Sequence, residues 1–379
     1  MQLIEAILAD ASAIAALRRD IHAHPELGLQ EHRTAELVAR KLESWGIEVT
    51  RGIARTGVVG TLRNGDGGRA IGLRADMDAL EMTEANDFAH RSTAPGAMHA
   101  CGHDGHTTML LGAARYLAET RNFDGTVHFI FQPAEEGLFD RFPCDAVYGA
   151  HNDTYLPVGT MVVVPGPVTA ASDRFWIRIR GKGGHAARPH RTIDPVVVGS
   201  HVVLALQSIV ARRVDPQEAA VLSITQFHAG STGNVIAEEA VLNGTVRTLQ
   251  PHVQDEIEAL MTSIVSATAA AHGAEAEVTY SRGYPPTINA DGPTERAAMA
   301  AARVLGEGKV IRDRRPGMGG EDFSFMALRV PGCFVRIGQA EGAVGSVPVH
   351  NPRYDFNDAI LPVGASFWST LVEQELPRR

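Results

Sequence analysis

The stretch TTMLLGAARYLAETRNFDGTVHFIF, residues 107–131, joins a helix pattern to a strand pattern. Apolar residues recur at helical spacing through Thr107–Ala118, and a short apolar run, Val127–Phe131, follows. Three more short runs of the kind typical of strands lie at Val58–Leu62, Ala70–Ala75 and Ala146–Ala150. This alternation predicts an α/β core with a mostly parallel sheet.

The chain changes character on either side of this core pattern. Towards the N-terminus, helical spacing marks residues 3–17 and Thr34–Trp45, with a break at His24 and Pro25. After Pro165-Gly166-Pro167, the segment Phe175–Arg180 alternates strictly between apolar and polar residues, which predicts a strand with one buried face. A domain boundary is therefore expected near residue 168.

The segment after that boundary has the order of a small α+β domain. We predict a helix at 195–212, strands at 220–227 and 239–248, a helix at 251–272 and a strand at 276–280. Helix and strand alternation returns after Tyr284-Pro285-Pro286. The predicted organisation is a catalytic domain formed by 1–168 and 284–379, interrupted by an inserted α+β domain at 169–283.

Composition excludes several classes of protein. The 379 residues carry a formal net charge of −9 with scattered basic residues, which argues against nucleic acid as a partner. Cys101, Cys144 and Cys333 are too few for a disulfide framework. The longest apolar stretch, Pro195–Ala211, includes polar residues and predicts a buried helix instead of a membrane span. The N-terminus lacks a basic leader, so we expect a cytoplasmic protein.

One segment concentrates chemically active side chains. Residues 98–106, MHACGHDGH, place one thiol, three imidazoles and one carboxylate at the start of a predicted helix. Cys101 and His103 together can offer a thiolate sulfur and an imidazole nitrogen to one cation of the zinc type. Taken alone, the segment also fits a polar helix entrance with Asp104 as a cap.

Two adjacent acids, Glu135 and Glu136, follow the predicted strand Val127–Phe131. Sites in open α/β sheets lie in the loops at the carboxyl ends of strands. One of the acids could bind a metal ion while the other acts as a general base. An isolated pair of glutamates would more often be a solvated turn.

Further candidate ligands lie at the ends of predicted strands or in loops. His151 follows one such strand, and His350 lies in a late loop. Asp76 and Asp78 end another strand and could bind metal or orient a ligating histidine. Each of these residues is weak evidence alone, because single histidines and acids are common on protein surfaces.

Taken together, the motifs resemble the M20 metallopeptidase family over nearly the whole chain and in the family's order. The subgroup that the chain resembles contains hippurate hydrolase, N-acyl-amino-acid aminoacylases and plant auxin-conjugate hydrolases. The matching segments are 74–80, 98–106, 132–137, 181–190, 234–236, 244–248, 319–323 and 350–358.

The resemblance implies a centre of two divalent metal ions, for which Zn, Mn, Co and Ni all suit the ligands. It implies that the inserted domain acts as a lid or dimerisation domain and that the chain forms a homodimer or homotetramer. Cys101 would bridge the ions, and the other ligands would be His103, Glu136, His151 and His350.

The resemblance also implies roles for residues outside the metal ligands. Glu135 would be the general base and acid for attack by a metal-bridged hydroxide on an amide. Asp78 would support the metal site. His185 would reach the active site of a partner subunit or close over its own, and Asn234 and Arg247 would hold polar groups of the substrate.

The predicted function is hydrolysis of N-acyl amino acids to a carboxylate and an amino acid. A dipeptidase or aminopeptidase of the same family is the main alternative, and a catalytically silent binding protein is a second. A thiol-redox protein is a weaker one, because Cys101 has no cysteine near it in sequence. The chain departs from the family pattern at Glu81 and Ala237, where proline is usual, and in the short connection after Gly137.

Overall fold

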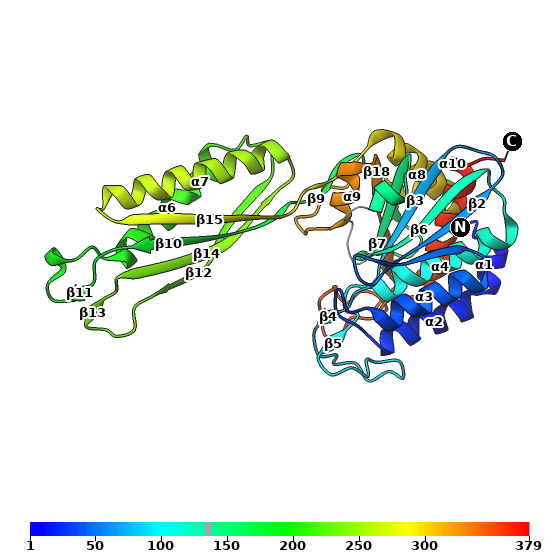
Figure 1. The fold of residues 1–379 in the computed structure, drawn as a ribbon, viewed down its shortest axis with the longest axis horizontal. Helices are drawn as coiled ribbons and strands as arrows, with labels where there is room; N and C mark the ends of the chain where they lie inside the picture. Colours follow the sequence, from blue (N-terminus) through cyan, green and yellow to red (C-terminus); the bar gives the residue numbers. More distant parts are fainter. Residues whose placement is uncertain (133–137, 379) are drawn as a thin grey trace. The chain divides into compact units, whose positions relative to one another are not determined.

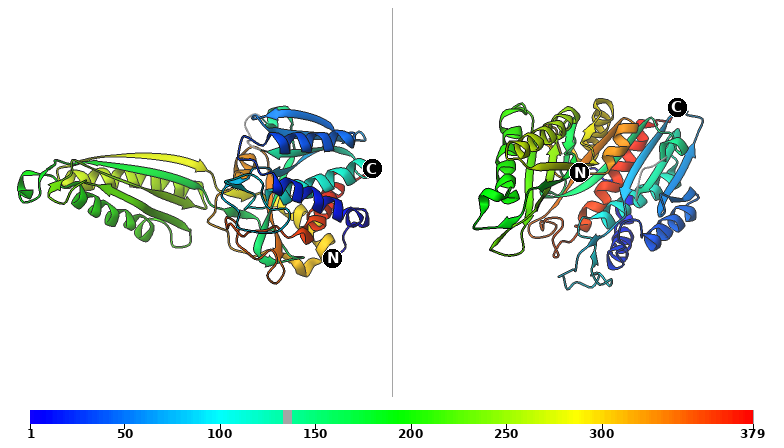
Figure 2. Two further views of the ribbon diagram at one scale, coloured as in Figure 1. Left: turned by 90° about the horizontal axis from the view of Figure 1, so that it is seen from below. Right: turned by 60° about the vertical axis from the view of Figure 1, so that its left-hand side comes forward.

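The computed structural model describes residues 1–132 and 138–378, and it divides into two compact units. The core unit consists of Met1–Gly166, Asn289–Arg314 and Met326–Arg379. The inserted unit consists of Pro167–Ile288 together with Arg315–Phe325, a short segment within the third predicted range. Figure 1 labels the helices and strands of both units, and Figure 2 gives two further views.

The core unit contains an eight-stranded mixed sheet whose centre is parallel. β3 runs parallel to both β6 and β7, and β18 runs parallel to β7. The predicted mostly parallel α/β sheet is confirmed. In sheet order the strands are β1 (Glu48–Ile53), β2 (Gly57–Asn64), β6 (Gly125–Gln132), β3 (Ala70–Asp76), β7 (Ala146–Pro157), β18 (Gly332–Ala340), β8 (Met161–Val162) and β17 (Val310–Ile311).

Helices of the core unit pack on the sheet through apolar side chains of alternate strand residues. Ile71, Leu73 and Ala75 of β3 belong to the same buried cluster as Leu110 and Ala114 of α4. This alternation leaves Arg74 and Asp76 on the opposite parity. The helices are α1 (Glu5–Ala9), α2 (Ala11–Ala23), α3 (His32–Ser44), α4 (His103–Thr120), α5 (Leu138–Arg141), α8 (Asp291–Leu305) and α10 (Leu361–Glu375), with α9 (Phe323–Arg329) across the unit boundary.

The inserted unit is a four-stranded antiparallel sheet with two long helices. Phe175, Ile177 and Ile179 of β10 are fully buried, whereas the residues between them are exposed, so the predicted one-faced strand is confirmed. The elements are β12 (Ala220–Ala229), β14 (Glu239–Thr248), β10 (Ser172–Arg180), β15 (Glu275–Tyr284), α6 (Pro195–Arg212) and α7 (Pro251–Ala271). Short two-stranded pairs complete the chain: β11 (Gly184–His185) with β13 (Val235–Ile236), β16 (Thr287–Asn289) with β9 (Gly166–Thr169), and β4 (Leu80–Glu81) with β5 (Ala97–Met98).

Helix α6 corrects the prediction that Pro195–Ala211 is buried. One face of the helix, including Val202 and Leu206, is buried in the apolar cluster of the inserted unit. The opposite face is open: Val197 is 49% exposed and Leu204 is 71% exposed. By length and composition alone, the helix is long and apolar enough to cross a membrane. A third of its residues are buried inside the protein. Apolar residues therefore lie on two faces of α6, and the inserted unit covers only one of them.

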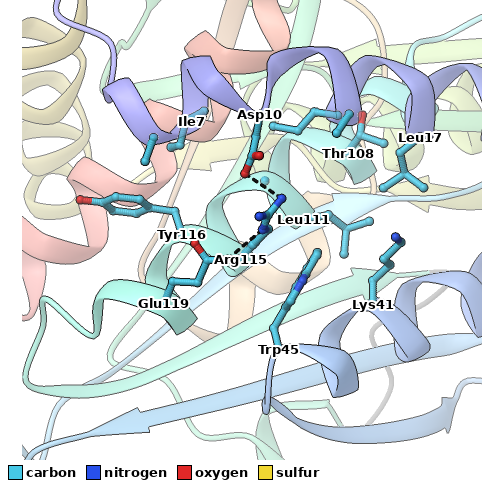
Figure 3. A pocket seen from close by; sticks show the side chains of 14 residues that line it. Ile7, Asp10, Leu17, Lys41, Trp45, Thr108, Leu111, Arg115, Tyr116 and Glu119 are labelled. Carbon is cyan, nitrogen blue, oxygen red and sulfur yellow. Dashed lines mark hydrogen bonds and ion pairs between the residues drawn. The ribbon is translucent and has the colours of Figure 1, made fainter.

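A cavity of about 80 Å³ lies among α1, α2, α3 and α4. Figure 3 shows Trp45 and Lys41 on one side and the ion pair of Asp10 with Arg115 (2.7 Å) on the other. The lining is mainly apolar, and no predicted site residue that the structure describes belongs to it. The predicted metal ligands that the structure describes lie elsewhere, at the carboxyl edge of the sheet.

Candidate metal centre

The backbone before α4 turns sharply and carries Cys101. Gly102 has a φ of 98°, a conformation that side chains with a Cβ rarely adopt, and it caps the helix that begins at His103. Gly105 is needed for space, because a Cβ there would lie 2.2 Å from the ring of Phe356. The two glycines of the motif therefore let the segment bend and pack closely around the site.

Strand β7 brings His151 to the same place. The predicted strand ended at Ala150, but β7 continues to Pro157. The backbone of His151 is therefore still part of the strand, where it pairs with Arg336 of β18. β7 pairs with β3 only as far as Gly149, which pairs with Arg74. His151 consequently projects at the carboxyl edge, beyond that pairing.

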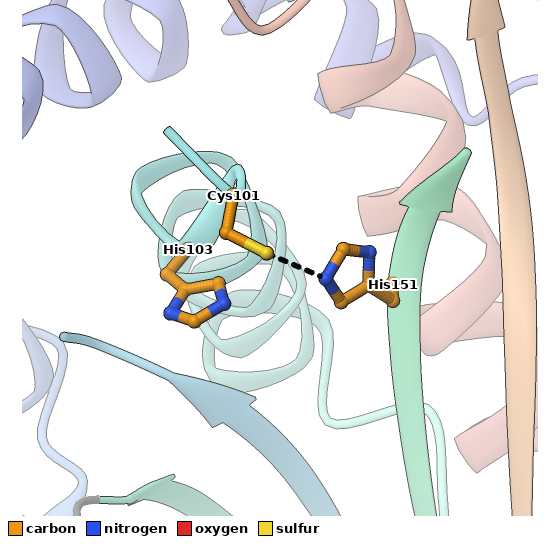
Figure 4. Close-up of side chains that lie close together, drawn as sticks. All are labelled: Cys101, His103 and His151. Carbon is orange, nitrogen blue, oxygen red and sulfur yellow. Dashed lines mark hydrogen bonds between the residues drawn. The ribbon is translucent and has the colours of Figure 1, made fainter. Parts of the chain in front are cut away.

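Cys101, His103 and His151 form one cluster although 50 residues of chain separate Cys101 from His151. The Cys101 Sγ lies 3.2 Å from the His151 Nε2, and one donor atom from each of the three residues lies within 4.8 Å of the others. Figure 4 shows the sulfur directed at the His151 ring. Burial opposes ionisation of the thiol, but His151 and His103 hold the pKa of Cys101 well below its usual value. A thiolate is thus available as a ligand.

Two aspartates hold His103 from the end of β3. The Asp78 carboxylate lies 2.9 Å from the His103 Nδ1, and Asp76 lies 3.5 Å from its Nε2. Although burial opposes charge on the ring, Asp76, Cys101 and Asp78 raise the pKa of His103 well above its usual value. The contact of Asp78 has the geometry that a supporting role requires, since it fixes the orientation of the imidazole.

His350 reaches the cluster from the late loop. Its backbone has a φ of 62°, which is unusual for a residue with a side chain, and its N–H donates to the Ala100 carbonyl oxygen at 2.7 Å. A hydrogen bond with Cys101 raises the pKa of the His350 ring. The structure therefore brings together the four predicted ligands that it describes.

Asp76, which the sequence offered as a ligand or a supporting acid, forms a buried group with His106 and Asn152, to which the sequence assigned no role. The Asp76 Oδ1 lies 2.6 Å from the His106 Nδ1, and the Asn152 backbone N–H donates to the His106 Nε2 at 3.0 Å. The Asn152 Oδ1 also lies 2.8 Å from the His106 Nε2, so Asp76 and Asn152 together hold both nitrogens of the His106 ring. Asp76, His103 and His106 also form a second group with metal-ligand spacing. The dense motif at residues 98–106 signalled His106, but no local rule assigned it a partner.

The donors fit divalent metal ions of the zinc type. A thiolate and imidazoles within one buried cluster are the ligands that such cations prefer, and the Asp78 carboxylate contacts the Nδ1 of the His103 ring as in known metal sites. Two groups of possible ligands share His103. The chemistry of the side chains thus suits more than one cation.

Comparison with known proteins gives a consistent result. A sequence model of peptidase family M20/M25/M40 matches residues 72–374. The chain belongs to this family. It is 39% identical over 382 residues to hippurate hydrolase from Campylobacter jejuni, covering 98% of each chain. It is 45% identical over 292 residues to an N-acyl-L-amino acid amidohydrolase from Geobacillus stearothermophilus, covering 73% of this chain and 78% of the relative.

A solved structure of the M20 family has the same fold. The Bacillus subtilis YXEP protein, a dinuclear metal binding peptidase, superposes with a TM-score of 0.85 at 34% identity, covering 97% of this chain and 99% of its own. The predicted assignment to the M20 hydrolases and the predicted fold are confirmed. Glu135 and Glu136 lie outside the described residues, whereas Leu138, the short connection after Gly137, is the first residue of α5.

The inserted unit of the M20 chain holds the three remaining predicted residues. His185 pairs with Val235 in the β11 and β13 sheet, so the neighbouring Asn234 lies beside it. Arg247 is near the opposite end of β14, eight residues from Glu239, where the strand begins. At a rise of about 3.3 Å per residue, this separates Arg247 from that end by roughly 26 Å. Asn234 lies five residues before Glu239, so one inserted unit holds Asn234 and Arg247 towards opposite ends of β14.

Proposed function

We propose that this chain hydrolyses the amide bond of N-acyl amino acids, releasing a carboxylate and an amino acid. The observation that carries the proposal is the cluster of Cys101, His103 and His151 at the carboxyl edge of a parallel sheet. Two M20 relatives, by their names, act on hippurate and on N-acyl-L-amino acids, which supports this substrate class.

The proposed ligands of two divalent ions are Cys101, His103, Glu136, His151 and His350. Bound divalent cations would lower the pKa of water and polarise the amide carbonyl, as in other metallohydrolases. Asp78 holds the His103 ring by its Nδ1, so the opposite nitrogen of the ring remains directed at the cluster. His106 and Asp76 fix the adjacent backbone of β7 through Asn152.

Glu135 is the proposed general base and acid. It would accept a proton from the attacking water and return one to the departing amine nitrogen. Replacement of a positioned general base typically costs about 10²–10⁴-fold in rate. Glu135→Gln should therefore lower kcat by that range and leave the metal content unchanged. Near-normal turnover of this variant at full metal content would exclude Glu135 as the base.

The proposed assembly is a homodimer. The separation of Asn234 from Arg247 requires that two copies of the inserted unit serve one active site if both residues contact the substrate. The open apolar face of α6, with Val196, Val197 and Leu204, supports an interface there. A higher assembly of such dimers would also satisfy these residues, and localisation in the cytoplasm stays a prediction.

The deciding experiment is release of amino acid from N-acetyl, N-benzoyl and indoleacetyl conjugates and from free dipeptides. Each assay uses chelated protein to which one divalent metal is restored. Metal-dependent cleavage of the conjugates but not of the dipeptides is the expected result. A 36% identical relative is a carboxypeptidase by name, so a peptidase is the second candidate. Cleavage of free dipeptides alone would favour it.

A further inference from the structure

Two buried cations on α2 contact the metal-centre segments without belonging to the proposed ligand set. Arg18 and His22 are one helical turn apart and therefore lie on the same face of the helix. Arg18 is 1% exposed and His22 is fully buried. Burial of two cationic side chains in a core helix is costly unless acidic side chains pair with them. The acidic partners of Arg18 and His22 therefore explain why both can be buried.

Arg18 binds three acids from two distant segments. Its Nε donates to Asp358 at 2.8 Å, and its Nη1 lies 3.0 Å from Asp355 and 3.3 Å from Asp104. Asp104 belongs to the first turn of α4, Asp355 lies in the loop that follows His350, and Asp358 begins the 3-10 helix η3 (Asp358–Ile360) after that loop. A planar guanidinium with five donors is suited to hold several carboxylates in fixed positions.

His22 joins a third segment to the same point. Its Nδ1 lies 2.9 Å from the Asp104 Oδ2, and its Nε2 lies 3.3 Å from the Glu84 Oε1. A carboxylate on each side calls for a proton on both ring nitrogens. Burial opposes this charge, but the hydrogen bonds to Asp104 and Glu84 raise the pKa of His22 to about 9.

These contacts converge on the segments that carry the proposed ligands. Asp104 is the neighbour of His103, and Asp355 and Asp358 follow His350 by five and eight residues. Glu84 lies six residues after Asp78, which holds the His103 ring. Three separate stretches of chain are thus tied to one turn of α2.

Stability alone does not account for such a cluster. Well-packed apolar residues of similar volume are often as stabilising as a buried group of ion pairs, because desolvation offsets much of the attraction. A metal site, in contrast, depends on ligands held within about 0.5 Å of their working positions. Fixed ion pairs between otherwise independent segments provide that constraint.

We propose that Arg18 and His22 are positioning residues that set the distance between the His103 turn and the His350 loop, and so the affinity of the centre for its metal ions. The inference rests on the proposed function, which makes His103 and His350 ligands. Both α2 residues would act through Asp104 and the segments that carry these ligands.

The test compares the zinc affinity of chelated variants by competition with a chromophoric chelator, alongside metal stoichiometry and urea unfolding of the metal-free proteins. Arg18→Met and His22→Gln are the informative variants, and Arg18→Lys tests rescue by a cation. Arg19→Met is the matched control, because Arg19 is 53% exposed but binds the same Asp358 at 2.9 Å. Ile14→Ala is the structural control: Ile14 is a buried residue of α2 that packs towards α4.

Outer partners of metal ligands typically contribute about 10–100-fold to metal affinity. Arg18 and His22 act one contact further out, through Asp104, so Arg18→Met and His22→Gln should each weaken zinc binding by about tenfold, the lower end of this range. Arg18→Lys should recover part of the loss, Arg19→Met should stay within about twofold, and Ile14→Ala should lower stability with affinity unchanged. Wild-type affinity in Arg18→Met would overturn the proposal, and if that variant does not fold, His22→Gln decides in the same way. A wild-type protein that binds no zinc or other divalent metal would instead overturn the proposed function.

Discussion

Protonation of one buried histidine, His128, should contribute measurably to the acid sensitivity of the core unit. His128 lies on β6, is 4% exposed, and its Nδ1 is 3.0 Å from the Thr61 hydroxyl on β2. Burial, with a smaller effect of Arg63, lowers the pKa of His128 from 6.5 to about 4. The folded protein therefore favours the neutral ring, whereas the unfolded chain binds a proton at higher pH.

The sign and size of the effect follow from that difference. A histidine with a lowered folded-state pKa contributes its full stability above its unfolded pKa and loses it as the pH falls towards the folded value. Each unit of difference corresponds to about 1.4 kcal/mol. Between about pH 7.5 and about pH 4.5, His128 should lower the free energy of unfolding by roughly 2.5 kcal/mol.

His128→Asn removes the titrating group and keeps a polar atom near Thr61. The variant should be less stable than the wild type at neutral pH because it leaves a cavity, but its stability should depend less on pH by roughly 2.5 kcal/mol over the same interval. Urea unfolding of metal-free protein, followed by tryptophan fluorescence at several pH values, measures both slopes. Parallel curves for the two proteins would refute the assignment, whatever their vertical offset.

Three further predictions concern packing, the metal centre and assembly. Gly105→Ala would place a Cβ 2.2 Å from the ring of Phe356 and should lower the free energy of unfolding by about 1–3 kcal/mol. Gly308→Ala is the control, because the space around Gly308 is open and its stability should change little. Thermal denaturation compares the two variants. Asp78→Asn should weaken zinc binding by about 10–100-fold in a chelator competition, and unchanged affinity would remove its supporting role. Leu204→Glu should convert the proposed dimer to monomers in sedimentation experiments, because it puts a charge on the open face of α6. A dimer that persists in this variant would place the interface elsewhere.

Local patterns in the sequence were sufficient for most elements of the fold. Strict alternation identified Phe175–Arg180 as a strand with one buried face, and the predicted bounds of the helix at 195–212 match α6. The same rules could not show how much of that helix is covered, because composition does not reveal whether a second layer packs on its outer face. Burial of α6 was therefore predicted too broadly.

Site residues were predictable where they lie in dense motifs and not where the fold assembles them. Cys101 and His103 are two positions apart in the sequence, so a thiolate and an imidazole that could bind one cation can be recognised from the sequence alone. Arg18 and His22 look like ordinary polar positions of an amphipathic helix. Only the folded chain places them against Asp104 and the acids of the late loop, more than 80 residues away. No rule based on local spacing could have paired them.

The length of β14 has a genetic consequence. If Arg247 and the His185 segment serve one active site from different chains, each active site needs an intact Arg247 from one chain and an intact His185 from the other. A preparation of His185→Ala chains and another of Arg247→Ala chains would then each be inactive. Subunit exchange between them would produce mixed dimers in which one of the two active sites contains only intact residues. Two inactive alleles would thus complement each other, and the recovered activity would rise with the fraction of mixed dimers.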